Sequence, residues 1–145
     1  MVEYIKEGKL HLATIIKNSF YKEGIEFFTD DDSSQQLGYM NRPQGYVIAP
    51  HRHNLVAREV HFTQEVLFIK SGKVRVDFYN NEQQYIKSSL LATGDVILLA
   101  DGGHGFKMIE TSEIIEVKQG PYCGERDKVR FEPIDDLIIT LNDKF

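Results

Sequence analysis

The chain has 145 residues, of which 41% are hydrophobic and 27% charged, and its formal net charge is −5. This length and composition exclude a disordered or fibrous protein and predict one globular domain, residues 1–145, with a single core. The acidic balance, without any basic run, argues against nucleic acid and anionic membranes as partners.

The sequence also indicates a cellular compartment. Cys123 is the single cysteine, which excludes an intrachain disulfide and a CxxC motif for zinc or redox chemistry. The N-terminal run MVEYIKEGKLHLATIIK lacks the pattern of a secretory signal, and no apolar run reaches the roughly eighteen residues that cross a bilayer. We therefore expect a cytoplasmic protein.

Residues 1–44 form the least regular part of the pattern, an N-terminal strand or lid segment. The apolar run LHLATII at residues 10–16 predicts a strand. The run TDDDSSQQ at residues 29–36 is typical of a solvated loop.

Residues 45–118 read as a series of short β-strands and form the predicted barrel core. Glycine and asparagine residues separate several of the runs and suit tight turns, so neighbouring strands are expected to pair antiparallel. Residues 119–145 follow as a C-terminal extension, in which DDLIITLNDKF fits either a strand or a short helix. The predicted strands lie within GYVIAPHRH, REVHFTQEVLFIK, KVRVDFY, QYIKSSLL, DVILLA, HGFKMI and SEIIEVKQ.

Period-two alternation predicts which faces of two strands are buried. In KVRVDFY the valines and the phenylalanine share a face toward the core, and the residues at 73, 75, 77 and 79 share a solvated face. In the later run, His104, Phe106 and Met108 share one face, which we assign to the inside of a curved sheet or barrel.

A cluster of histidines and carboxylates lies in PHRHNLVAREVHFTQE, residues 50–65. If the chain turns through a five-residue loop, His53 lies opposite Glu59 and His51 lies opposite His61, with all four side chains on one face. With a four-residue loop the two histidine pairs point to opposite sides of the sheet. In the first register, imidazole and carboxylate groups converge as ligands for a divalent Fe, Mn, Ni, Cu or Zn ion.

These residues resemble the first motif of the cupin superfamily, G(x)5HxH(x)3-4E(x)6G. Gly45, His51 and His53 match its beginning, and Glu65 with Gly72 matches its end. The resemblance implies an all-β fold, a small antiparallel barrel of the jelly-roll or double-stranded β-helix type.

The chain departs from the cupin pattern in both motifs, and the departure in the first motif leaves the carboxylate ligand open. Eleven residues separate His53 from Glu65, so Glu59 competes with Glu65, and we favour Glu59 because it would lie directly across from His53. The second motif, G(x)5PxG(x)2H(x)3N, is similar to the stretch from Gly94 to His104. Ala100 stands at its proline position, its histidine comes one residue early, and its asparagine position is not filled.

The leading interpretation is a mononuclear metal site formed by His51, His53, Glu59 and His104. One or two open coordination positions would accept a small oxygen-rich ligand, such as a sugar-like or keto-acid-like compound. The metal would act as a Lewis acid or as a site of dioxygen activation.

The candidate catalytic residues are His61 and Glu65, either of which would act as a base beside the metal. One alternative is a metal-free ketoisomerase or epimerase of nucleotide sugars that uses His51 and His53 as acid and base. Another is a non-catalytic module that senses a small ligand, since one fold supports many functions.

The many short strands also predict a homodimer, because strand edges in such a domain have to be covered. The LHLATII strand is the expected segment for exchange or pairing between the two copies.

Overall fold

The computed structural model describes residues 1–141, which form ten β-strands and two short 3₁₀ helices. This confirms the all-β prediction, whereas the cupin jelly roll stays a prediction. The strands fall in two units, one of Met1–Phe20 with Thr63 onward and one of Tyr21–Phe62. None of the helices in the described part of the chain has the length and hydropathy that a membrane span requires.

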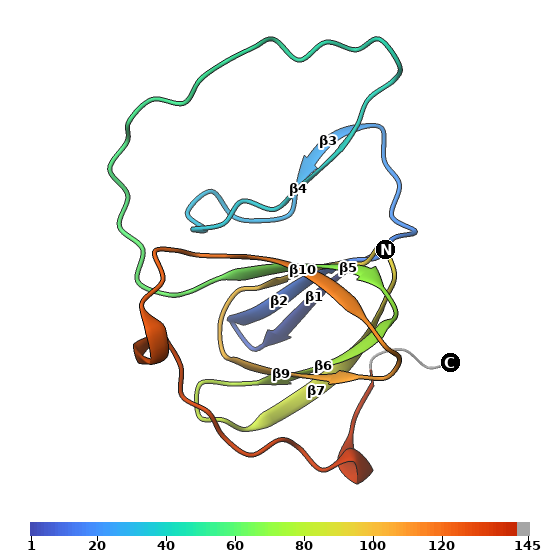
Figure 1. The fold of residues 1–145 in the computed structure, drawn as a ribbon, viewed down its shortest axis with the longest axis vertical. Coiled ribbons are helices and arrows are strands. Elements are labelled where there is room, and N and C mark those ends of the chain that lie inside the picture. Colours follow the sequence, from blue (N-terminus) through green and yellow to red (C-terminus); the bar gives the residue numbers. More distant parts are fainter. Residues whose placement is uncertain (142–145) are drawn as a thin grey trace. The chain divides into compact units, whose positions relative to one another are not determined.

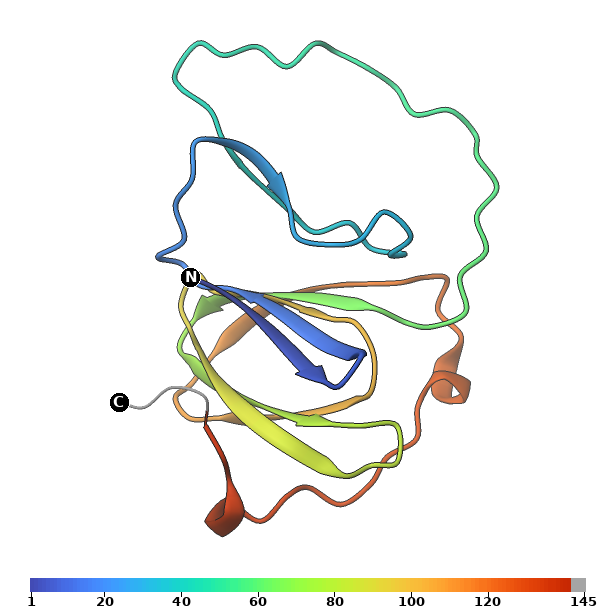
Figure 2. The same cartoon turned by 180° about the vertical axis from the view of Figure 1, so that it is seen from behind.

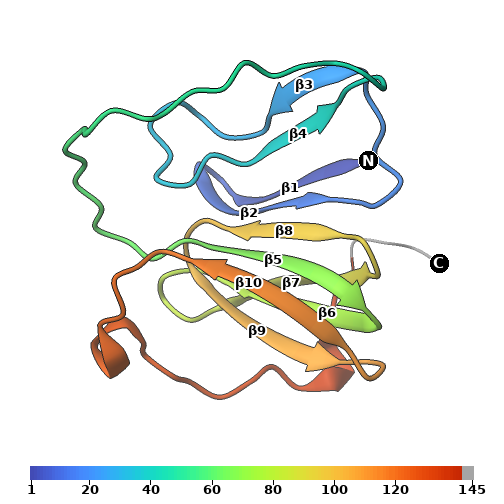
Figure 3. The ribbon, with the colours of Figure 1, turned by 45° about the horizontal axis from the view of Figure 1, so that its top comes forward.

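The first unit contains two antiparallel sheets that face each other, as Figures 1 and 3 show. The strand order leaves each sheet open, with a different strand at each of its two edges. The five-stranded sheet has the order β1 (Val2–Glu7), β2 (Leu10–Ile16), β8 (Val96–Leu99), β5 (Glu65–Ser71), β10 (Glu113–Lys118), and the three-stranded sheet has the order β7 (Tyr85–Ala92), β6 (Lys73–Tyr79), β9 (Gly103–Met108).

The core lies between the two sheets and is formed by aliphatic side chains and one phenylalanine. Period-two alternation brings them to the inner faces, and burial of each Val, Leu, Ile or Phe side chain contributes about 1.5–3 kcal/mol. Both β1 and β2 contribute, so the core extends beyond residues 45–118. Its members are Ile5, Leu12, Ala13, Ile15, Leu67, Ile69, Val74, Val76, Phe78, Leu91, Ile97 and Leu99.

Glycines make the turns that the sequence predicts. Gly72 joins β5 to β6 with a φ of 90°, and Gly94 precedes β8 with a φ of 88°. A Cβ at Gly72 would lie 2.3 Å from the carbonyl oxygen of Thr111, so this turn excludes any side chain as well as favouring positive φ.

One prediction about β6 is wrong. Its supposedly solvated face is buried, because Arg75, Asp77 and Tyr79 are only 8%, 3% and 4% exposed. Residues 131–141 of the C-terminal segment cover this face, with Ile134 bonded to Tyr79 and Asp136 bonded to Arg75. The alternation is correct, but a distant part of the chain decides that both faces are buried.

The LHLATII run forms β2, as predicted, but it is not an edge strand. It pairs with β1 on one side and with β8 on the other, and Figure 2 shows the β1–β2 hairpin clearly. Within one copy both edges of β2 are therefore occupied, so β2 has no free edge for pairing with a second copy, whereas its exchange between copies and the homodimer stay predictions. The edges of the two sheets are β1 and β10, and β7 and β9.

The second unit contains one antiparallel hairpin, β3 (Gly24–Phe27) and β4 (Gly38–Asn41). Its connection includes the predicted loop at residues 29–36. The hydroxyl of Thr29 donates to Oε1 of Gln36, whose amide donates to the carbonyl oxygens of Asp30 and Ser33.

Residues 42–62, which we call the histidine segment, contain no strand, although the sequence predicts strands at both of its ends. Every residue from 43 to 62 is exposed. The Val, Ile and Tyr side chains of this segment therefore have no sheet surface to pack on, and β-propensity depends on such packing. Pro43 and Pro50 also lack the N–H that a strand ladder needs.

Candidate functional site

The structure divides the candidate site residues between the two units. His51, His53, Glu59 and His61 belong to the histidine segment, whereas Glu65 and His104 belong to the first unit. The predicted set of four metal ligands is therefore split, with His104 in a different unit from the other three.

The histidine segment does not form the predicted hairpin. Because it has no strand, the cross-strand pairs of His53 with Glu59 and of His51 with His61 are not formed. The contacts are local: His51 Nδ1 lies 3.0 Å from the carbonyl oxygen of Ala49, and the rings of His51 and His53 meet edge to face at 5.3 Å. His61 Nε2 lies 3.4 Å from Glu59 Oε1, with both side chains largely exposed.

Glu65 is the first residue of β5 and faces the core. It alternates with Leu67 and Ile69, so its side chain shares their inner face, and it is 8% exposed. A carboxylate in such a position needs a partner, since burial of an unpaired charge is costly.

His104 is that partner. It lies on β9 opposite Phe78 of β6, which places it on the inner side of the three-stranded sheet. Its Nε2 is 3.4 Å from Oε2 of Glu65, and the two side chains are 28% and 10% exposed. The ring of Phe106 lies beside the imidazole, with 5.5 Å between the ring centroids.

The environment of Glu65 lowers the pKa of its carboxyl group. The hydrogen bond with His104 is the largest cause, and the positive charge of that imidazole when protonated adds to it. Burial raises the pKa and opposes part of this effect, whereas a hydrogen bond with Glu116 and the charge of Lys118 lower it further. Glu65 is therefore held as a carboxylate at neutral pH.

Glu116 and Lys118 of β10 are part of this site but were missed in the sequence. Lys118 lies directly opposite Glu65 in the β5–β10 ladder, and Glu116 lies opposite Leu67, so both are on the inner face. The run EIIEVK could have indicated this position, because side chains alternate along a strand and Glu116 and Lys118 therefore lie on the same side as Ile114. We call Glu65, His104, Glu116 and Lys118 the Glu65–His104 site.

The predicted face of β9 is confirmed. His104, Phe106 and Met108 lie opposite the three core residues of β6, on the inner side of the sheet. Phe106 and Met108 nevertheless remain 38% and 48% exposed. The reason is that β9 is an edge strand, so one side of its inner face has no neighbouring strand to cover it.

The Glu65–His104 pair fits two positions of a metal site. A carboxylate oxygen and an imidazole nitrogen are donors that divalent transition metals accept. Within residues 1–141, no three histidine, cysteine, aspartate or glutamate side chains are grouped closely enough to hold a metal ion. The four-residue ligand set therefore stays a prediction, but the argument that favoured Glu59 over Glu65 is lost with the hairpin.

Comparisons of the chain with protein-family models, with curated proteins and with solved structures gave no match. The cupin resemblance therefore rests on the two motifs alone. Likeness of fold would in any case be a weak guide to chemistry.

Proposed function

We propose that the chain binds a small oxygen-rich ligand, sugar-like or keto-acid-like, at a divalent metal that Glu65 and His104 help to hold. One observation carries this proposal. The last carboxylate of the first motif and the histidine of the second motif come from β5 and β9, yet their side chains lie 3.4 Å apart.

The residues present support this role in several ways. Glu65 is kept ionised, so its carboxylate is ready to bind a cation without losing a proton. Its contact with Nε2 fixes the orientation of the His104 ring. A bound Fe, Mn, Ni, Cu or Zn ion would supply Lewis acidity toward a carbonyl or hydroxyl oxygen of the ligand.

Further ligands would have to come from outside this pair. The first motif implies His51 and His53 for this role, on the resemblance alone. Lys118 and Glu116, which neighbour Glu65, are suited to donate to and accept hydrogen bonds from ligand oxygens.

The second candidate is a metal-free acid–base function, favoured by the pair itself. A carboxylate that holds one imidazole nitrogen leaves the other nitrogen to exchange a proton with a ligand. Since Nε2 of His104 faces Glu65, Nδ1 would be that nitrogen. A keto-sugar with a proton next to its carbonyl is a substrate of the appropriate kind.

Elemental analysis of protein purified without a histidine tag or chelator tests the proposal. We expect about one metal ion per chain, lost in Glu65→Gln and His104→Ala and retained in the exposed control Glu113→Gln. If the wild-type protein holds no metal and takes up none of the five ions on titration, the metal-based proposal is wrong and the acid–base candidate replaces it.

A further inference from the structure

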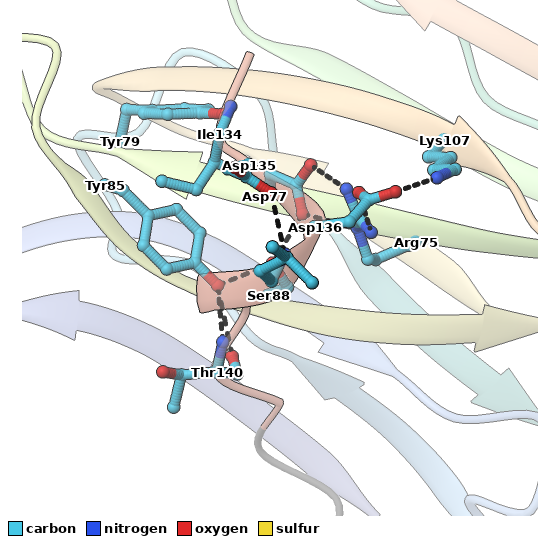
Figure 4. Close-up of polar contacts among 11 residues, drawn as sticks. Arg75, Asp77, Tyr79, Tyr85, Ser88, Lys107, Ile134, Asp135, Asp136 and Thr140 are labelled. Atoms are coloured by element: carbon cyan, nitrogen blue, oxygen red, sulfur yellow. Dashed lines mark hydrogen bonds and ion pairs between the residues drawn. The ribbon is translucent and has the colours of Figure 1, made fainter.

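The outer face of the three-stranded sheet binds an extended segment of the same chain. Residues 131–141, which we call the strap, lie across it and contact all three strands (Figure 4). Several of the hydrogen bonds between the strap and these strands involve main-chain atoms of the strap, so this surface recognises an extended backbone as well as one particular side chain.

The strap is held at its two ends by tyrosines. At one end, the N–H of Ile134 donates to the hydroxyl of Tyr79 at 3.0 Å. At the other end, the N–H of Thr140 donates to the hydroxyl of Tyr85 at 2.9 Å. The carbonyl oxygen of Thr140 also accepts from the N–H of Ser88 at 2.7 Å, which places the strap at the edge of β7.

The centre of the strap is held by Asp136. Nη1 of Arg75 donates to its Oδ1 at 2.8 Å, and Nζ of Lys107 donates to its Oδ2. Both interactions lower the pKa of the Asp136 carboxyl group, the Lys107 hydrogen bond most. The carboxylate therefore links β6 and β9 from outside the sheet.

Hydrogen bonds inside the sheet orient the guanidinium of Arg75 toward Asp136. Its Nε and Nη2 donate to the two carboxylate oxygens of Asp77 at 2.8 and 2.9 Å, and Ser88 Oγ donates to the same carboxylate. This buried set fixes the guanidinium plane and leaves Nη1 directed at the strap. The sheet thus offers a preorganised receptor for one carboxylate.

Polar contacts attach the centre of the strap, where Leu137 and Ile138 are 90% and 61% exposed and contribute little burial. Its first residue, Phe131, is half-buried, and its ring meets that of Tyr79 edge to face with 4.9 Å between the centroids. The residues that precede the strap, 119–130, contain no strand that would tie it to the first unit. Such an attachment opens at a lower cost than a packed strand does.

We infer that the strap is exchangeable and that its second binding partner is the same sheet face of another copy of this chain. Every copy carries both the strap and its receptor, so two open copies can close on each other around a two-fold axis with the same contacts. In such a dimer, the exposed side chains of Leu137 and Ile138 of one strap would contact those of the other strap.

Energy transfer between labelled copies tests this inference on the full chain. Cys123 is the single cysteine, is exposed, and precedes the strap, so it accepts a donor or an acceptor dye without any substitution. Donor-labelled and acceptor-labelled chains are mixed at micromolar to sub-millimolar concentrations, and energy transfer is followed with time. We expect transfer to develop slowly and to grow with protein concentration.

The Asp136→Ala variant distinguishes strap exchange from other interfaces. Because the strap makes the same contacts within one copy and between two, losing Asp136 should leave the final transfer nearly unchanged but speed its appearance by about tenfold. Glu132→Ala is the matched control, since Glu132 lies in the same segment, is exposed, and makes no hydrogen bond or ion pair with the described residues; its rate should equal that of the wild type. No transfer at any concentration, or equal rates in wild type and Asp136→Ala, would overturn the inference.

Discussion

Oε2 of Glu65 lies 3.4 Å from Nε2 of His104, on the inner sides of two facing sheets. The two residues are far apart in the sequence, and their strands, β5 and β9, are not hydrogen-bonded to each other. They meet because the two sheets pack face to face.

Removal of either member should abolish metal binding if the proposal is correct. In His104→Ala the metal content should fall from about one ion per chain to near zero, because one of few nitrogen donors is lost. The first motif implies the same result for His53→Ala, whereas His61→Ala should keep its metal. Mass spectrometry of the purified variants measures the content, and full metal in His53→Ala would show that the first motif does not supply a ligand.

Stability should depend on the ionisation of Glu65. Since its pKa is lowered in the folded protein from the ordinary 4.5, its contribution is fully present above about pH 4.5 and is lost as pH falls through the folded value. The unfolded chain binds the proton first, so the free energy of unfolding decreases on acidification. Urea titrations of chelated wild type and Glu65→Gln should differ at pH 7 and converge as the pH falls below about 4.5; a constant difference would contradict this assignment.

The buried Arg75–Asp77 pair should be sensitive to loss of one partner. In Asp77→Ala the guanidinium of the buried Arg75 loses its bidentate carboxylate and keeps only Asp136 among the described residues, and the expected cost is about 3 kcal/mol in the free energy of unfolding, the lower end for a broken buried pair. The control is Lys70→Ala, which breaks the exposed pair of Lys70 with Glu113 and should cost no more than about 1 kcal/mol. Equal losses in the two urea titrations would refute the importance of this buried pair.

Gly72→Ala should be costly for two separate reasons. Its φ of 90° disfavours any L side chain, and a Cβ would lie 2.3 Å from a backbone oxygen. We expect a loss of at least about 2 kcal/mol. Gly8 has a φ of 57°, but a Cβ added there would have no atom within 4 Å, so Gly8→Ala should cost only about 1 kcal/mol. Thermal unfolding of both variants separates the steric term from the conformational one.

The strands of the first unit were largely predictable from sequence. The run KVRVDFY forms β6 over its full length, and turns follow at the predicted glycines. The alternation of side chains along a strand and the positive φ of a turn depend on a residue and its close neighbours. A single sequence is therefore enough to predict them.

The candidate site was predictable only in part. Alternation correctly placed His104 on an inner strand face, and the first motif offered Glu65, which lies beside it, as one of two competing carboxylates. The preference for Glu59 depended on a hairpin in the histidine segment that does not form. A run rich in Val, Ile and Tyr becomes a strand only where a neighbouring strand and a covered face exist, and local composition does not report either.

What the sequence by itself determined is the all-β class, the position of most strands, and the face on which each side chain lies. The tertiary structure alone decided what covers those faces. Arg75, Asp77 and Tyr79 alternate as expected, yet they are buried because Asp136 and its neighbours, about sixty residues later in the chain, bind over them. Likewise, Lys118 lies beside Glu65 only through the register of β10 on β5. Side-chain direction is set by the local backbone, whereas burial and partners are set by contacts between distant segments, which follow from the free energy of the whole fold.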